Sequence, residues 1–250
     1  MRTILWSDSH GLHEQCGLPE GDVLIFAGDI GRRGTVEELV SFNAFLGRLP
    51  HPKKIVVAGN RDYFFERQPE ESKRLLTNAV YLQDEEISVG GIRIYGSPWQ
   101  PPFMNTAFNL PRGKPLQEKW AHIPEGIDIL VTHTPPFSVG DKTAAGIHVG
   151  CADLSDAVHR IRPRLHVFGH VHEGYGMVRT EGIVFVNASL TDASMQLTHE
   201  PIVFELSDST LTPLPPAPAP VPSDARDKLG EGKPVFFRRD EGGLSPHTNN

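Results

Sequence analysis

Short apolar runs rich in β-branched residues recur along the chain, and most of them end in a glycine or a polar side chain. The clearest runs cover residues 3–6, 23–27, 55–58, 129–131 and 165–168. Near-continuous apolar runs of this length are typical of strands that are buried on both faces. We therefore expect a central sheet with other layers packed on each side of it.

Two helices are expected between these strands. Residues 35–38 carry a capping-box pattern, in which a Thr hydroxyl and a Glu carboxylate satisfy free backbone amides. Residues then recur at helical spacing: Val36, Leu39, Val40, Asn43 and Leu46. Residues 153–161 show the same spacing over a shorter length. Strands that alternate with helices pair in parallel, so the pattern predicts an α/β fold.

Three later apolar runs, at residues 91–95, 183–186 and 202–206, have no long helical pattern between them. They predict added strands in a second sheet packed on the first. Residues 98–124 are rich in Pro, Asn and Gly. We expect an irregular segment there, and long irregular segments often form a functional lid or rim.

The composition changes after residue 206, because residues 213–222 contain six prolines. Such a tract favours polyproline II or a spacer over a packed core. We therefore place one domain at residues 1–206 and a Pro-rich, flexible tail at residues 207–250. A tail of this kind is a possible ligand for a domain that recognises polyproline II, such as an SH3 or WW domain.

Charge and hydropathy exclude several classes of partner. The net charge of −7 over 250 residues argues against a broad nucleic-acid surface. No apolar run approaches the ~20 residues of a membrane-spanning helix, and the N-terminus does not resemble a secretory signal. The two cysteines, Cys16 and Cys151, are too few for a disulfide framework. We expect no membrane association and a cytoplasmic location.

Side chains that can bind metal ions follow five of the apolar runs. They are Asp8 with His10, Asp29, Asn60, His133, and His170 with His172. Each of them alone is more often a turn residue, a helix cap or an ordinary hydrogen-bonded histidine. Because the carboxyl ends of parallel strands meet at one edge of a sheet, however, all seven are expected to converge.

The chemistry of this set favours two divalent cations. Carboxylate, imidazole and amide oxygen donors suit Mn, Fe or Zn, and the set contains no thiolate of the kind typical of structural zinc sites. Seven such donors at one sheet edge are enough for a pair of ions. The sequence therefore predicts a dinuclear metal centre, whose metals it does not identify.

The order of these motifs resembles the signature of the calcineurin-like metallophosphoesterase superfamily. The matching segments are Asp8-Ser9-His10, Gly28-Asp29, Gly59-Asn60, Thr132-His133 and Gly169-His170-Val171-His172. Residues 99–101, 108–113, 132–136, 168–176 and 187–189 are also similar to its MPPED-type (UPF0046) group. The resemblance implies a four-layer α/β/β/α sandwich of two packed mixed sheets.

The resemblance also implies a role for each ligand. A first metal would be held by Asp8, His10 and His172, a second by Asn60, His133 and His170, and Asp29 would bridge the two. A hydroxide between the metals would attack phosphorus in line with the leaving oxygen. The expected function is a phosphoester hydrolase, with a phosphodiesterase on small substrates favoured and cyclic nucleotides among the candidates.

One position departs from this pattern. The superfamily usually has His after Gly-Asn, whereas this chain has Arg61, followed by Asp62. A guanidinium can bind phosphate oxygens but cannot usefully give up a proton. Loss of general-acid help costs ~10²–10⁴ in rate, and the cost is smallest for good leaving groups, which favours diesters and activated esters with low turnover. The alternative is that Arg61 pairs with a surface acid and points away from the site.

Several further expectations remain open at this stage. Asn109 and Arg112 are expected to contact substrate, while Trp99 and Phe103 either shape a base pocket or pack within their loop. The alternative functions are a phosphomonoesterase, a protein phosphatase or a nuclease that uses the same site. Because Arg61 replaces the usual His, an interaction module of low activity is a further alternative.

Overall fold

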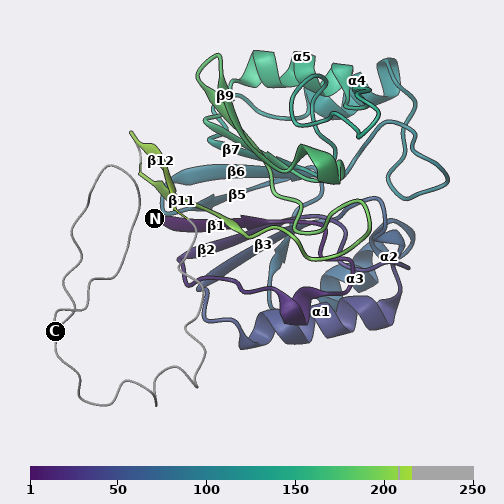
Figure 1. Cartoon of the computed structure of the whole chain (residues 1–250), viewed down its shortest axis with the longest axis vertical. Coiled ribbons are helices and arrows are strands. Elements are labelled where there is room, and N and C mark those ends of the chain that lie inside the picture. The colour runs from purple at the N-terminus through teal and green to yellow at the C-terminus, as the bar shows by residue number, and fades with distance from the viewer. Residues whose placement is uncertain (208, 216–250) are drawn as a thin grey trace, which may run out of the picture. The chain divides into compact units, whose positions relative to one another are not determined.

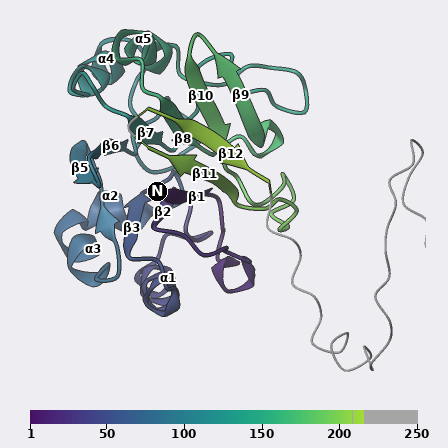
Figure 2. The same ribbon diagram turned by 90° about the vertical axis from the view of Figure 1, so that its left-hand side faces the viewer.

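The computed structural model describes residues 1–207 and 209–215, and in that part of the chain the strands form two six-stranded sheets (Figure 1). The first sheet has, in spatial order, β12 (Leu211–Leu214), β11 (Ile202–Leu206), β1 (Arg2–Trp6), β2 (Val23–Ala27), β3 (Lys53–Val57) and β4 (Val80–Tyr81). β1 to β4 pair in parallel, while β11 runs antiparallel to β1. This edge, with β11 and β12 beside β1, faces the viewer in Figure 2.

The second sheet is also mixed. Its order is β5 (Glu85–Val89), β6 (Ile92–Ser97), β7 (Ile129–Thr132), β8 (Leu165–Phe168), β10 (Ile183–Asn187) and β9 (Gly176–Thr180). β6, β7, β8 and β10 are parallel, and an antiparallel strand closes each edge. The apolar runs predicted as strands all occur in these two sheets.

Helices cover the outer face of each sheet, which gives four layers (Figure 1). The first sheet is covered by α1 (Val36–Arg48), α2 (Tyr63–Arg67) and α3 (Pro69–Leu75), and the second by α4 (Lys114–Ala121) and α5 (Ala152–Ile161). Two short 3-10 helices, η1 (His13–Gln15) and η2 (His172–Gly174), lie in connecting loops. The expected α/β/β/α sandwich is confirmed.

Alternation along β1 shows how the layers form. Leu5 points into the core between the sheets, whereas Ile4 and Trp6 point to the helical layer. The Trp6 ring packs edge-on against Phe26 at 4.6 Å and lies 5.8 Å from Phe42 of α1. Because both faces are buried along most of its length, β1 is apolar from Ile4 to Trp6, and polar side chains resume only past its carboxyl end.

Helix α1 does not bury all of the residues that recur at helical spacing. Val40 is 49% exposed, and Asn43 accepts a hydrogen bond from the backbone N–H of Asn78. The buried positions between Leu39 and Leu46 are instead Phe42 and Phe45, which lie on the side that meets the sheet. The helix expected from the spacing is present, and its buried face includes these two phenylalanines, which the spacing pattern did not include.

Two expected irregular segments contain regular structure. Residues 98–124 include α4, where Pro115 lies in the first turn and Leu116 and Trp120, four residues apart, are buried. β12 extends the first sheet beyond residue 206, and Pro213 is tolerated there because β12 is an edge strand. Residues 216–250 of the expected tail lie outside the described residues.

None of the helices in residues 1–207 and 209–215 has both the length and the apolar character needed to cross a bilayer.

The start of α1 yields a prediction about stability. The Glu38 carboxylate accepts backbone N–H bonds from Arg32, Arg33 and Thr35, at 2.9–3.1 Å. We expect Glu38→Ala to lower the free energy of unfolding by about 2 kcal/mol, because it frees several amides at once. Thr35→Ala removes one cap bond and should cost about 1 kcal/mol.

Urea unfolding followed by circular dichroism measures both changes. Val40→Ala, on the exposed face of the same helix, is the control and should change stability by less than about 0.5 kcal/mol. A Glu38→Ala loss no larger than the Val40→Ala loss would contradict this account of the capping box.

Candidate metal centre

All seven expected ligands lie in loops that leave the carboxyl ends of parallel strands. Their source strands are β1 for Asp8 and His10, β2 for Asp29, β3 for Asn60, β7 for His133, and β8 for His170 and His172. The first three strands belong to one sheet and the last two to the other. The centre therefore lies where the same edges of both sheets meet.

Four of these ligands have an unusual backbone conformation. The φ angles of Asp8, His10, Asp29 and His170 are 54°, 44°, 64° and 68°. Side chains other than glycine rarely adopt this left-handed region. Such strain persists where surrounding structure over-determines the conformation, and it concentrates at functional sites.

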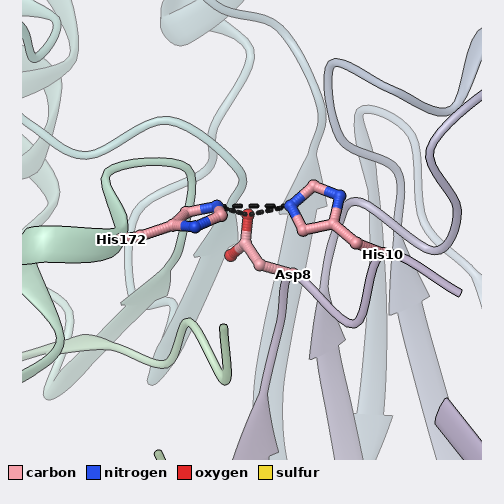
Figure 3. A group of neighbouring side chains, drawn as sticks. All are labelled: Asp8, His10 and His172. Atoms are coloured by element: carbon pink, nitrogen blue, oxygen red, sulfur yellow. Dashed lines mark hydrogen bonds and ion pairs between the residues drawn. The ribbon is translucent and has the colours of Figure 1, made fainter. Parts of the chain in front are cut away.

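The first cluster of donors surrounds Asp8 (Figure 3). The Asp8 Oδ1 atom lies 3.3 Å from His172 Nε2 and 3.8 Å from His10 Nε2. The two Nε2 atoms are 3.2 Å apart, and Asp29 Oδ2 lies 3.8 Å from His10 Nε2. Two side chains from the loop after β1 and one from the distant loop after β8 thus direct one donor atom each at the same point.

The second cluster surrounds Asn60. Its Oδ1 atom lies 2.9 Å from His133 Nε2 and 2.8 Å from His170 Nδ1. The Asp29 Oδ1 atom lies 3.5 Å from His133 Nε2, while its Oδ2 faces His10 of the first cluster. The Asp29 carboxylate therefore stands between the clusters, with one oxygen directed at each.

The hydrogen bonds of the Nδ1 atoms show which nitrogen of each imidazole ring can bind a metal ion. Nδ1 of His133 donates to the Ala27 carbonyl at 2.9 Å, and Nδ1 of His172 donates to the Asp192 carbonyl at 2.7 Å. In the neutral form of either ring the single N–H is therefore on Nδ1, and Nε2 carries the lone pair, as in metal-binding histidines.

Two lone pairs that face each other at the second cluster indicate that cations fit the site. His133 Nε2 and Asn60 Oδ1 face each other at 2.9 Å as two acceptors with no proton between them. A shared cation would satisfy both lone pairs. In the described part of the chain, groups of acidic and histidine ligands within 4.8 Å of one another occur twice, as Asp8–His10–His172 and Asp8–Asp29–His133. The donor set therefore fits two divalent ions.

Residues outside the ligand set orient Asp8. Its Oδ2 atom accepts hydrogen bonds from Ser7 Oγ at 2.6 Å, Ser189 Oγ at 2.8 Å and the backbone N–H of His170 at 3.1 Å. These bonds leave Oδ1 for the first cluster. The roles of Ser7 and Ser189 were not predicted, although residues 187–189 belong to the segments that carry the family resemblance.

Asp62 holds the loops that carry Asp29 and Asn60. Its carboxylate accepts backbone N–H bonds from Asp29, Ile30 and Gly59, at 2.7–3.0 Å. Burial and the nearby Asp29 charge raise the pKa of Asp62 to about 7. One alternative from the sequence was that Arg61 pairs with Asp62 or another surface acid, whereas Asp62 is buried and anchors the strained turns.

Burial shifts the protonation of the ligands. It lowers the pKa of His10 to about 4 and that of His170 to about 3, so both are neutral at pH 7. Burial and the Asp8 charge raise the pKa of Asp29 well above its ordinary value. A nearby positive charge would stabilise ionised Asp29, which is what a bridging carboxylate requires.

Asp8 and His172 behave as a pair. Burial alone would raise the pKa of Asp8 and lower that of His172, but their mutual hydrogen bond and charge outweigh it. The pKa of Asp8 lies below its usual range, and that of His172 rises to about 9. These opposite pKa shifts of Asp8 and His172 show that the site stabilises a positive charge beside the Asp8 carboxylate.

Five of the seven donors, His10, Asp29, Asn60, His170 and His172, line a cavity of about 170 Å³. Arg61 and Phe103 also line it, so the Arg61 side chain borders the centre rather than turning away. The Phe103 ring meets the His170 ring edge-on at 5.0 Å. Phe103 and His170 also line a second cavity of about 430 Å³, which therefore adjoins the first.

The other residues considered as substrate contacts lie farther out. Arg112 lines the second cavity. The Asn109 side chain is bonded within its own loop, to Gln100 and to the backbone of Phe103. The Trp99 indole donates to Asp84 and packs on Phe108, so it lies in the loop core.

Comparison with known proteins agrees with this geometry. Residues 5–174 match the calcineurin-like phosphoesterase family. Metallophosphoesterase domain-containing protein 1 of Homo sapiens is 44% identical over 230 residues, which cover 82% of this chain and 71% of that protein. UPF0046 protein C25E10.12 of Caenorhabditis elegans is 40% identical over 238 residues, covering 86% and 82%.

A solved structure shares the fold at low identity. The protein TT1561 of Thermus thermophilus is 14% identical, with a TM-score of 0.50, and the match covers 74% of this chain and 88% of that one. The match across residues 5–174 contains every predicted metal ligand. The chain belongs to the calcineurin-like phosphoesterase family.

Proposed function

We propose that this protein is a metal-dependent phosphodiesterase that acts on small phosphoesters, with cyclic nucleotides among the candidate substrates. One observation carries the proposal. The two oxygens of Asp29 face two separate donor clusters, and side chains of both clusters line a cavity that Arg61 borders.

The ligands divide into two sets. Asp8, His10 and His172 would hold one ion, Asn60, His133 and His170 would hold the other, and Asp29 would contact both. Two divalent cations, of Mn, Fe or Zn, would neutralise charge on the phosphoryl oxygens and lower the pKa of a water molecule for attack on phosphorus.

Arg61 supplies the chain's own positive charge. Its guanidinium stays protonated at any physiological pH, so it can bind phosphoryl oxygens and stabilise charge that develops on them. For the same reason it cannot pass a proton to the leaving oxygen. Its backbone N–H also donates to Asp29 Oδ1 at 2.7 Å, which couples its position to the bridging carboxylate.

Charge and space both favour a diester. The carboxylates of Asp29 and Glu173 line the cavity with Arg61, and a diester brings one negative charge fewer than an ionised monoester. The adjoining cavity of about 430 Å³ has the size of a small-molecule site, so it can hold the organic group of a diester.

The two thiols support the cytoplasm as the proposed place of action. Cys16 and Cys151 are free, and Cys151 is buried at the start of α5. Burial raises the pKa of both thiols, which keeps them protonated and unreactive.

Replacement of the bridging carboxylate tests the proposed reaction. We expect Asp29→Asn to lower the hydrolysis of bis(p-nitrophenyl) phosphate with Mn²⁺ by more than ~10²-fold, because even outer contacts to metal ligands are worth 10–100-fold. Asp156→Asn, at an exposed position of α5, is the matched control and should keep wild-type activity.

The same assay separates the alternatives. Wild-type protein that prefers p-nitrophenyl phosphate would contradict the diesterase and support a phosphomonoesterase. Protein that binds no divalent metal and hydrolyses neither substrate would support the interaction module.

Metal affinity provides a readout that needs no substrate. We expect Ser189→Ala to weaken divalent metal binding about 10–100-fold, because Ser189 holds the Oδ2 atom of Asp8. Isothermal titration of metal-free protein with Zn²⁺ measures the change, and exposed Ser194→Ala serves as the control. Unchanged affinity in Ser189→Ala would contradict the assignment of Asp8 as a ligand.

Arg61 should act on the phosphoryl group whichever alcohol leaves. We expect Arg61→Ala to lower kcat/KM about 10–100-fold, the value of a hydrogen bond to a charged group, on aryl and alkyl diesters alike. Arg61→Lys keeps the charge and should lose less. An effect confined to one class of leaving group would contradict this role.

A further inference from the structure

A histidine–carboxylate pair lies outside the metal centre, in the loop between β7 and α5. Nδ1 of His148 lies 2.6 Å from Oδ1 of Asp141. Asp141 is fully buried, and its Oδ2 atom accepts backbone N–H bonds from Ser138 and Gly150, both at 3.0 Å. A carboxylate held on both oxygens in this way fixes the orientation of the imidazole ring.

The loop that carries His148 is fastened beside the metal centre. Arg112 donates to the carbonyls of Val149 and Gly150, at 3.2 and 3.0 Å. On the other side, Glu173 accepts the backbone N–H of Ala144 at 3.2 Å. Glu173 directly follows the ligand His172, so the position of the loop is tied to the ligand loop.

His148 lines the second cavity together with the ligand His170. Because Nδ1 is bonded to Asp141, Nε2 is the ring nitrogen available to a molecule in that cavity. The ring of Phe137 lies against the imidazole, 5.7 Å between centroids. The cavity thus joins a metal ligand, a place for an organic group, and an oriented imidazole.

Arg61 leaves the departing oxygen of a phosphodiester without a proton donor. When the phosphorus–oxygen bond of an alkyl ester breaks, the departing alkoxide is strongly basic and needs a proton. Arg61 cannot provide it, as its proton is held too tightly. Histidine is the side chain that ordinarily exchanges protons near neutral pH, and a buried carboxylate is the usual partner that orients it.

We propose that His148 is the general acid for the leaving oxygen and that Asp141 positions it, a role that rests on the proposed diesterase function. Water forms a bond to phosphorus, and the bond to the leaving oxygen breaks with its electron pair on that oxygen. The oxygen takes the proton of His148 Nε2 and leaves as an alcohol. The proton lost by the attacking water passes to solvent, from which His148 is reprotonated.

Leaving groups of different basicity test the proposal. We expect His148→Gln to lower kcat/KM at least ~10²-fold for an alkyl diester such as methyl p-nitrobenzyl phosphate, assayed with Mn²⁺. Bis(p-nitrophenyl) phosphate, whose leaving group needs no proton, should be hydrolysed at nearly the wild-type rate. His159→Gln, on the exposed side of α5, is the matched control and should leave both rates unchanged.

The outcomes separate this proposal from the function beneath it. Wild-type protein that hydrolyses neither diester contradicts the phosphodiesterase itself. Equal losses on both diesters in His148→Gln, with wild type active, contradict only the role of His148 as an acid.

The tautomer of His148 gives a readout that needs no metal and no turnover. Nitrogen NMR of metal-free protein at high pH should show His148 protonated on Nδ1, the less common form, because Asp141 accepts from that atom. Asp141→Asn should weaken this preference and reproduce the loss that is selective for the alkyl diester. A wild-type ring protonated on Nε2 would overturn the proposal.

Discussion

The centre depends on two buried carboxylates held close together. Asp8 and Asp29 are 0% and 2% exposed, and with His133 their ligand atoms lie within 4.8 Å of one another. Two like charges at that distance repel by about 3 kcal/mol at an effective dielectric constant of about 20, in addition to the cost of burial. Burial keeps the imidazoles of His10 and His170 neutral, so only His172, whose pKa is raised beside Asp8, offsets part of this repulsion in the metal-free site. Divalent cations would offset it, which makes the donor set and its metals a single electrostatic unit.

The fold serves this unit by bringing strand ends together from two sheets. Apolar packing on both faces leaves few polar side chains within the parallel strands, and the ligands begin where these strands end. The strained turns at Asp8 and Asp29 are held by backbone bonds, of which those to Asp62 connect the loops after β2 and β3. Buried hydrogen bonds thus offset the free-energy cost of the left-handed backbone, and metal binding by the Asp8 and Asp29 side chains is not needed for this.

In the proposed mechanism, two parts of the site contact different groups of a phosphodiester. Arg61 and the donor clusters contact the phosphoryl group, where negative charge accumulates. The His148–Asp141 pair lies on the wall of the adjoining cavity, where the alcohol would leave. This division explains how a chain with Arg in place of the usual His could still cleave an ester of a basic alcohol.

The sequence by itself determined the strands and the seven candidate metal ligands, because these follow from apolar runs and from short motifs at strand ends, while the four-layer class followed from the family resemblance of those motifs. Tertiary structure decided which face of α1 is buried, that β12 joins an edge, and that Asp62 lies inside. It also placed Ser189 on Asp8, 181 residues away along the chain, and pointed Arg61 at the cavity. Such contacts depend on how distant segments pack, and no local pattern of residues records that arrangement.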